Sequence, residues 1–365
     1  MQVVFQHLFY QPTGFGTAAR EIALAMDDLG VDVKLVLVGS PSDRLNLETV
    51  ERLQQLERKP LQGDRVLLTI LSPGGAREYR KTISCMMFET SKAPPVYVAA
   101  ANQFDALIVP CEMNRQLFKN GGVTVPIYVA PYGVNSQVFT PHGPARELGR
   151  GDGDYVFLSV FGWSTRKGPD ILIDAFLREF TADDHVRLVL KTHDGSVTHF
   201  PRDWYDRVAA QTPSPRSPRV DILTEDLTPE EVAMMYRGAD CFVLPSRGEA
   251  VGLPYLESMA SGLPVIATGW GGHTVFLNPQ CGYLVPFRLV PAHPDRFSGL
   301  YQPDQLWAEA DGGALRTIMR RVYLRREEAR TKGQAARKVS EYWNWQRSGS
   351  AFVQAIESIV GQPIR

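Results

Sequence analysis

Short apolar runs alternate with amphipathic stretches along most of the chain. The strands expected in the first half are 3–9, 31–38, 66–70, 106–109 and 127–130, with a helix over 17–29. The second half predicts strands over 155–161, 186–191, 220–223, 241–244 and 265–267, and helices over 169–180, 229–237 and 254–260. Such alternation is typical of parallel sheets joined by right-handed crossovers. We therefore expect an α/β fold with two Rossmann-like units.

The break between the two units is expected in the stretch Thr140–Asp154, which is rich in Gly, Pro and charge. This places one unit at 1–148 and the other at 149–344. Residues 211–218 are expected to form a surface loop. The segment 286–313 has few periodic signals and is expected to be an irregular insertion near the active-site cleft. From residue 314 onward the pattern is helical, with many arginines in its first half, which indicates a solvated face or a surface that contacts a membrane.

Composition narrows the class of protein. The 365 residues carry 39 Lys and Arg against 40 Asp and Glu, so no excess of positive charge recruits nucleic acid. The four cysteines are scattered, which argues against disulfides and structural zinc. No apolar run approaches the roughly 18 residues of a spanning helix, and the N-terminus lacks the pattern of a signal peptide. These features predict a cytoplasmic protein, with the inner membrane face as an alternative setting.

Two glutamates carry the strongest chemical signal. Glu249 follows the apolar run 241–244, and Glu257 lies eight positions later, within a helix that Pro254 is suited to begin. The loop therefore delivers one carboxylate just before a helix N-terminus and the other just inside it. Unpaired N–H groups at that end attract phosphate, and carboxylates accept hydrogen bonds from hydroxyls. This combination suits a ligand that is both a sugar and a diphosphate.

At these residues the chain resembles the retaining GT-B glycosyltransferases, most closely family 4, which carry a Glu-x7-Glu signature before a GLPxLEAMAxGxPVIA run. The resemblance implies two Rossmann-like domains facing a cleft, with the terminal helix, about 345–365, packing back on the first. It assigns Glu249 to the donor sugar and Glu257 to the ribose. It also implies that the donor contacts the chain at Ala250, Val251, Gly252 and Leu253. The family's first glycine is Ala250 here, which leaves the donor sugar open.

A basic turn follows the strand 155–161. Arg166 and Lys167 stand beside the N-terminus of the next helix, where cations are unfavourable unless an anion is bound. The family's form of this turn is GRLxxxKGxDxLIxA. Lys167 matches it, whereas Trp163 replaces the usual arginine and Arg166 lies next to Lys167 instead. We expect both cations to bind the diphosphate; the alternative is a solvated turn.

Three further positions are weaker candidates. Leu227 lies in a loop that the resemblance places at the nucleobase, although it could equally belong to the core. Gly14 and Gly16, with Ala19, match GxGxxA, which is found in dinucleotide-binding enzymes and also resembles the glycine pair that reaches the donor phosphates in this family. Glu89 lies in an FExxxxP stretch, where many relatives have a histidine, and could orient or deprotonate the acceptor hydroxyl or simply form a salt bridge.

The resemblance implies transfer of a sugar from a UDP-, GDP- or ADP-linked donor to an acceptor hydroxyl, with retention at the anomeric carbon and no metal or cofactor. Polysaccharide, glycolipid or glycoconjugate synthesis is the expected setting, and the oligomeric state is left open. Replacing Lys167 by alanine is expected to reduce turnover with little loss of folding. The alternatives are an NAD-dependent oxidoreductase that uses the Gly14 and Gly16 loop and a non-catalytic sensor of sugar nucleotides.

Overall fold

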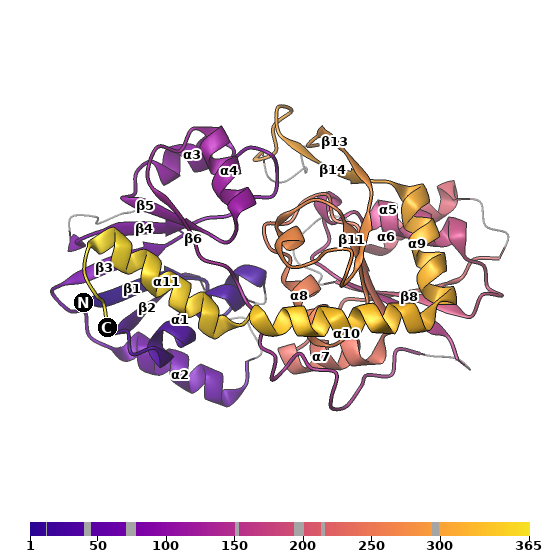
Figure 1. Ribbon diagram of the computed structural model, residues 1–365, viewed down its shortest axis with the longest axis horizontal. Helices are drawn as coiled ribbons and strands as arrows, with labels where there is room; N and C mark the ends of the chain where they lie inside the picture. Colours follow the sequence, from indigo (N-terminus) through magenta and orange to yellow (C-terminus); the bar gives the residue numbers. More distant parts are fainter. Residues whose placement is uncertain are drawn as a thin grey trace. The chain divides into compact units, whose positions relative to one another are not determined.

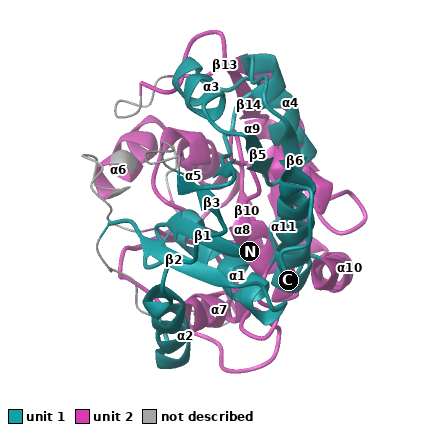
Figure 2. Cartoon of the chain, turned by 90° about the vertical axis from the view of Figure 1, so that its left-hand side faces the viewer, with its two compact units in different colours: residues 1–133, 343–365 teal, residues 134–342 magenta. Residues whose placement is uncertain are grey.

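The computed structural model describes residues 1–11, 13–39, 45–70, 78–149, 153–192, 201–212, 216–293 and 299–365. It divides into two compact units, Met1–Gly133 with Trp343–Arg365, and Val134–Tyr342 (Figure 2). The boundary expected at residue 148 lies inside the second unit, because the segment before it is bound to one of that unit's helices. Arg237 Nε donates to Pro144 O at 2.6 Å, and Arg146 N donates to Met234 O at 2.8 Å.

Three expected loops extend beyond the described residues. Residues 150–152 of the expected linker, 213–215 of the surface loop and 294–298 of the insertion lie outside them.

The first unit is a six-stranded parallel sheet in the order β2-β1-β3-β4-β5-β6 (Figure 1). Its strands are β1 (Gln2–His7), β2 (Val33–Leu37), β3 (Arg65–Thr69), β4 (Thr82–Cys85), β5 (Ala106–Val109) and β6 (Ile127–Val129). Its helices are α1 (Gly14–Asp28), α2 (Leu47–Arg58), α3 (Pro95–Ala101), α4 (Glu112–Gly121) and the terminal α11 (Trp345–Val360).

Helix α11 belongs to the first unit although it is last in the chain. The Asn344 side chain accepts a hydrogen bond from Arg347 N and so begins the helix, as expected of an N-cap residue. The helix then packs along α1, and a side chain at Gly349 would meet the Ala25 Cβ at 2.7 Å. Trp345 lies against Tyr132 with ring centroids 6.1 Å apart. This close packing joins the end of the chain to its beginning, and both termini lie in the first unit (Figure 2).

The second unit contains a six-stranded parallel sheet in the order β12-β11-β10-β7-β8-β9. Its strands are β7 (Tyr155–Val160), β8 (Val186–Lys191), β9 (Arg219–Leu223), β10 (Cys241–Leu244), β11 (Val265–Thr268) and β12 (Tyr283–Val285). Its helices are α5 (Pro169–Glu179), α6 (Pro201–Gln211), α7 (Pro229–Gly238), α8 (Leu253–Ala260), α9 (Gly312–Leu324) and α10 (Arg326–Tyr342).

The order of these strands reverses between β7 and β10. The chain builds β7, β8 and β9 outward in one direction, then returns to place β10, β11 and β12 on the other side of β7. Helix α5 packs against α6 and α9, while α8 packs against α7 and α10. In doubly wound sheets of this kind, ligands bind beyond the carboxyl ends of the strands at the point of reversal.

The segment 286–313 differs from the irregular insertion that the sequence predicted. It contains an antiparallel ribbon of β13 (Phe287–Pro291) and β14 (Leu306–Ala310), in which Leu289 pairs with Ala308 (Figure 1). Trp307 is fully buried and lies beneath the guanidinium of Arg247. Burial of this tryptophan fixes the ribbon to the loop that follows β10.

Candidate functional site

Two loops meet at the point where the sheet of the second unit reverses. One follows β7 and carries the short 3-10 turn Thr165–Lys167, and the other follows β10 and carries Ser246–Glu249. Arg247 N donates to Arg166 O at 2.7 Å. Gly168 has a left-handed φ of 68°, and a Cβ there would lie 2.3 Å from Pro245 O. A glycine is therefore needed for the two loops to approach this closely.

This approach brings Lys167 and Glu249 into a direct ion pair. Lys167 Nζ lies 2.5 Å from Glu249 Oε1, and both side chains are largely buried, with 13% and 6% of their surface exposed. Arg166 Nη1 donates to Gly248 O at 2.6 Å and lies 3.5 Å from Glu249 Oε2. Arg166, Lys167 and Glu249 therefore form one cluster, although Glu249 lies more than 80 positions after the other two in the sequence.

The environment keeps Glu249 ionised. Burial by itself would raise the pKa of its carboxyl group, but the charges of Lys167 and Arg166 and the hydrogen bonds from Lys167 and Ser246 outweigh it and lower the pKa to about 2. The cluster thus contains two cations and one carboxylate. With two cations against one carboxylate, the three residues together carry a net positive charge.

Glu257 is the fifth of the eight residues of α8 and lies in a different environment. Its Oε2 accepts a hydrogen bond from Tyr236 Oη at 2.9 Å, and no ion pair to it is found in the described part of the chain. Burial raises its pKa to about 7, although the hydrogen bond from Tyr236 opposes the shift. The two glutamates therefore differ in charge state near neutral pH. A partly protonated Glu257 can both donate to and accept from a hydroxyl.

The segment from Ala250 to Leu253 forms the entry into α8. Ala250, Val251 and Leu253 are buried, and Gly252 adopts a left-handed conformation at the N-cap, where no side chain caps the helix. Gly272 N donates to Glu249 O at 2.7 Å, so the loop after β11 is hydrogen-bonded to the start of this segment. The predicted donor-binding residues of this segment thus lie between the carboxylate of Glu249 and the start of the helix that holds Glu257.

Arg247 is a further residue of the site that sequence reasoning missed. Its side chain is only 5% exposed and its guanidinium binds the carboxylates of Asp170 and Glu309 together. The distances are 2.9 and 2.7 Å to Asp170 and 2.6 and 3.2 Å to Glu309, and Nη1 also donates to Thr165 O at 2.6 Å. Arg247 therefore fixes the Arg166–Lys167 turn, the start of α5 and the β13–β14 ribbon to one another.

The loop before α7 has a clear structural role. Thr228 Oγ1 accepts from Glu231 N, and the Glu231 side chain accepts from Thr228 N, which confirms the predicted capping box. Leu227 just before it is half-buried. Its contact with a nucleobase remains a prediction.

The remaining predicted residues lie in the first unit. Gly14 is exposed at the start of α1, whereas Gly16 is buried, and a Cβ at Gly16 would lie 2.2 Å from Gln11 O. Arg20 supports this turn by donating to Phe9 O at 2.8 Å. Glu89 is half-buried between β4 and α3. A tight turn accounts for Gly16, and the donor contacts of Gly14 and Gly16 and the role of Glu89 stay predictions.

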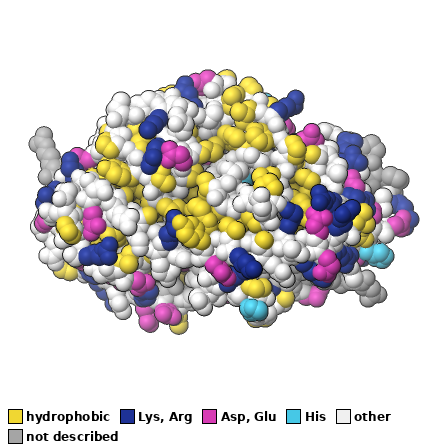
Figure 3. Space-filling view, viewed as in Figure 1, with side chains coloured by type: hydrophobic (Ala, Val, Ile, Leu, Met, Phe, Trp, Pro, Cys, Tyr) yellow, Lys and Arg dark blue, Asp and Glu magenta, His cyan; other side chains and the backbone are white. Residues whose placement is uncertain are grey.

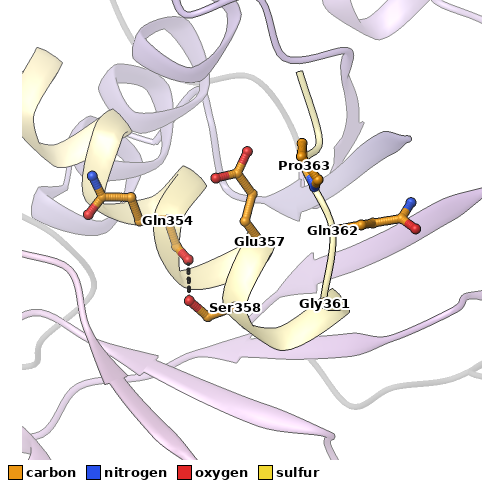
Figure 4. Close-up of a pocket in the computed structure, with 6 residues that line it drawn as sticks. All are labelled: Gln354, Glu357, Ser358, Gly361, Gln362 and Pro363. Atoms are coloured by element: carbon orange, nitrogen blue, oxygen red, sulfur yellow. Dashed lines mark hydrogen bonds between the residues drawn. The ribbon is translucent and has the colours of Figure 1, made fainter.

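One hollow on the described surface is formed by residues outside the Lys167–Glu249 cluster. It lies at the end of α11 and is lined by uncharged polar groups and one carboxylate, from Gln354, Glu357, Ser358, Gly361, Gln362 and Pro363 (Figure 4). Ser358 Oγ there donates to Gln354 O at 2.8 Å. Among the described residues, no three His, Cys, Asp or Glu side chains are grouped closely enough to hold a metal ion.

The arginines of α9 and α10 are mostly engaged with acids. Arg316 and Arg320 pair with Glu179 at 3.2 and 2.8 Å, and Arg321 pairs with Glu328 at 2.7 Å. On the face shown in Figure 3, basic and acidic side chains are interspersed. Within the described ranges, no helix is long and apolar enough to cross a membrane.

Comparison with known proteins gives a family for the part of the chain that holds this site. Residues 153–301 match the model of the family described as glycosyl transferases group 1. The chain is 32% identical over 196 residues to the alpha-monoglucosyldiacylglycerol synthase of Streptococcus pneumoniae, covering 52% of this chain and 41% of the relative. It is 33% identical over 172 residues to the D-inositol 3-phosphate glycosyltransferase of Geodermatophilus obscurus, covering 44% and 37%. The match thus spans less than half the length of these relatives.

The fold also has solved counterparts. The structure of Anabaena Alr3699/HepE in complex with UDP and glucose superimposes with a TM-score of 0.70 at 16% identity, covering 98% of this chain and 100% of that one. At this identity the likeness concerns the fold alone. The expected GT-B fold, with its two Rossmann-like sheets, is confirmed.

Proposed function

We propose that the protein transfers a sugar from a nucleoside diphosphate to an acceptor hydroxyl, because residues 153–301 match the glycosyl transferases group 1 family and contain the site described above. The observation that carries the proposal is the buried pair of Lys167 and Glu249, 2.5 Å apart at the reversal point of a doubly wound sheet. A cation for phosphate and an acceptor for hydroxyls lie side by side there.

The donor is proposed to bind along the carboxyl ends of the strands. Its diphosphate takes the positive charge of Lys167 and Arg166, and Glu249 accepts hydrogen bonds from the sugar hydroxyls. Glu257, in helix α8, binds the ribose hydroxyls. The backbone from Ala250 to Leu253 faces the sugar and the distal phosphate at the start of α8, where helix N–H groups favour negative charge.

The reaction breaks the bond between the anomeric carbon and the diphosphate oxygen, and forms a bond from that carbon to the acceptor oxygen. The electron pair of the broken bond goes to the departing diphosphate, where Lys167 and Arg166 stabilise the developing charge. The acceptor proton passes to the leaving phosphate on the same face, which retains the anomeric configuration. Glu89 is proposed to orient the acceptor hydroxyl.

The identity of the substrates follows from the relatives only as a proposal. One relative is named for a glycolipid and another for an inositol phosphate, and the HepE structure holds UDP and glucose. We propose UDP, GDP or ADP as the donor nucleotide and a polysaccharide, glycolipid or glycoconjugate precursor as the acceptor. A setting in the cytoplasm, at the inner membrane face where the acceptor is a lipid, is consistent with this choice.

A thermal-shift panel tests the proposal. UDP-, GDP- and ADP-sugars are added to the purified protein, and one of them is expected to raise the melting temperature, because a ligand that binds the native state stabilises it. Release of the nucleoside diphosphate in the presence of an acceptor then measures turnover. Stabilisation by nicotinamide dinucleotides alone would support the oxidoreductase alternative, and donor binding without any transfer or hydrolysis would support the sensor.

The Lys167→Met variant tests the role of the cation. The sequence analysis expected little loss of folding on removal of Lys167, but the ion pair changes this expectation, since the variant leaves the Glu249 carboxylate buried with only Arg166 nearby. Lys167→Met combined with Glu249→Gln is expected to recover stability without recovering turnover, because no buried charge is then left without its partner. Lys338→Met, at an exposed position of α10, is the control. Full turnover in the Lys167 variant would contradict the mechanism.

A further inference from the structure

A further buried cation, Lys191, lies at the same edge of the sheet as the proposed donor site. Lys191 is the last residue of β8, and only 6% of its surface is exposed. Its Nζ donates to Thr192 O at 2.7 Å, and this is its single hydrogen bond among the residues that the structure describes. The mechanism proposed above makes no use of this ammonium group.

The surroundings of Lys191 leave two polar groups without a sufficient partner. No carboxylate of the described residues forms an ion pair with Lys191, although buried lysines are usually paired. Glu225 and Asp226 act on it from a distance, and Glu225 is already bound by Arg146 at 2.5 Å. Beside it, Thr192 Oγ1 is buried and has no hydrogen-bond partner in the described part of the chain.

The position of Lys191 in the sheet relates it to the donor. Lys191 pairs with Val160 of β7 on one side and with Leu223 of β9 on the other. The Arg166–Lys167 turn follows β7, and the loop containing Leu227 follows β9. Neighbouring strands lie about 4.8 Å apart. A nucleotide with its diphosphate at the turn and its base toward the loop must therefore cross the end of β8.

We propose that Lys191 and Thr192 read the base of the donor nucleotide and select a base with a carbonyl oxygen next to a ring N–H. This inference rests on the proposed function. The ammonium group of lysine donates hydrogen bonds and accepts none, while the threonine hydroxyl can accept one. On the edge used for base pairing, uracil and guanine present a carbonyl oxygen beside a ring N–H donor. Adenine and cytosine present an amino donor at the position of that oxygen. The pair thus favours UDP or GDP over ADP and CDP.

Calorimetric binding of UDP, GDP, ADP and CDP to the full chain tests this assignment. The wild-type protein is expected to bind UDP or GDP at least about tenfold more tightly than ADP and CDP, because a mismatched polar edge leaves buried groups unpaired. Lys191→Met is expected to lose about tenfold or more in affinity for the preferred nucleotide, with little change for ADP. Thr192→Val gives a smaller loss in the same direction. Lys338→Met, exposed on α10, is the matched control and keeps the wild-type preference.

The outcomes separate this inference from the proposed function. If ADP or CDP binds best, or if Lys191→Met weakens all four nucleotides equally, Lys191 does not read the base, while the transferase proposal stands. If no nucleotide binds the wild-type protein, the proposed function itself fails. Should Lys191→Met not fold, the wild-type protein is measured with the preferred nucleotide and with its analogue in which sulfur replaces the keto oxygen. Several-fold weaker binding of the analogue is expected, and equal binding would overturn the inference.

Discussion

Arg247 joins three separate segments of the second unit, and its replacement by methionine removes that connection while keeping much of the side-chain volume. The guanidinium holds Asp170 at the start of α5, Glu309 in the ribbon strand β14 and the carbonyl of Thr165 in the basic turn. Arg247→Met therefore leaves two carboxylates facing each other without a cation. Their mutual repulsion adds to the loss of the hydrogen bonds.

The magnitude follows from the exposure of the groups involved. Removing one partner of a buried ion pair costs about 3–5 kcal/mol. The Arg247 side chain is 5% exposed, but Asp170 and Glu309 keep 34% and 29% exposure, so water solvates them in part after the change. We therefore expect the free energy of unfolding to fall by about 3 kcal/mol, at the lower end of that range.

Urea denaturation followed by circular dichroism measures this loss. Arg216→Met is the matched control, because Arg216 pairs with Asp183 at 2.8 Å while both side chains are about two-thirds exposed, at 65% and 64%. Such a surface pair contributes under about 1 kcal/mol. Arg247→Met combined with Asp170→Asn and Glu309→Gln is expected to recover part of the stability, since no uncompensated charge remains.

The same variant affects function through the basic turn. Without the bond to Thr165, the turn that carries Arg166 and Lys167 loses its side-chain anchor. Affinity for the proposed donor is therefore expected to fall at temperatures where the protein is still folded. An Arg247→Met protein as stable as the Arg216 control would refute the reasoning. A triple variant no more stable than Arg247→Met would show that the carboxylates are not the source of the loss.

Three further predictions concern the two glutamates and the terminal helix. The pKa of Glu257 is about 7, above its ordinary 4.5, so its protonated form is favoured in the native state and wild-type stability falls as pH rises from about 4.5 to 7. Glu257→Gln is expected to remove this decline, so that by pH 8 its free energy of unfolding has gained at most about 3 kcal/mol relative to wild type. Parallel curves of unfolding free energy against pH for the two proteins would contradict this prediction. Glu249 behaves in the opposite way, because its pKa is about 2 and its charged form stabilises the native state above pH 4.5. This stability is lost as pH falls toward 2, so Glu249→Gln is expected to flatten the curve of unfolding free energy below pH 4.5. Gly349→Ala places a methyl group 2.7 Å from the Ala25 Cβ and is expected to cost about 1–3 kcal/mol in urea denaturation, whereas Gln346→Ala on the exposed side of α11 changes little.

The sequence predicted the elements that follow strong apolar periodicity. Strand β10 is a continuous apolar run, β8 is apolar apart from Arg187 and Lys191, and the helix start at Thr228 has its capping partners three residues apart. Strand β4 was missed because its four residues include two hydroxyl side chains, Thr82 and Ser84, and it is buried only through tertiary packing. The β13–β14 ribbon was missed because prolines end β13 and its strands pair across a long loop.

The site was predictable where its residues lie in short motifs. Glu249, Glu257 and Lys167 each lie in a local pattern, which placed Glu249 and Lys167 in loops that follow strands and Glu257 inside the next helix. Arg247 could not be found in this way, since its partners Asp170 and Glu309 lie 77 and 62 residues away. Lys191 was hidden for a related reason. A lysine at the end of an apolar strand normally reaches solvent, and only the packed sheet shows that it does not.

The ion pair between Lys167 and Glu249 balances the charge of these two groups in the most buried part of the proposed donor site. Inorganic phosphate could bind Lys167 only by leaving the Glu249 carboxylate without its counter-charge. A free sugar could bind Glu249 only by competing with Lys167. A molecule that brings hydroxyls and phosphates together can satisfy both groups at once. Under the proposed function, the ion pair would therefore favour binding of the intact sugar nucleotide over binding of free phosphate or free sugar.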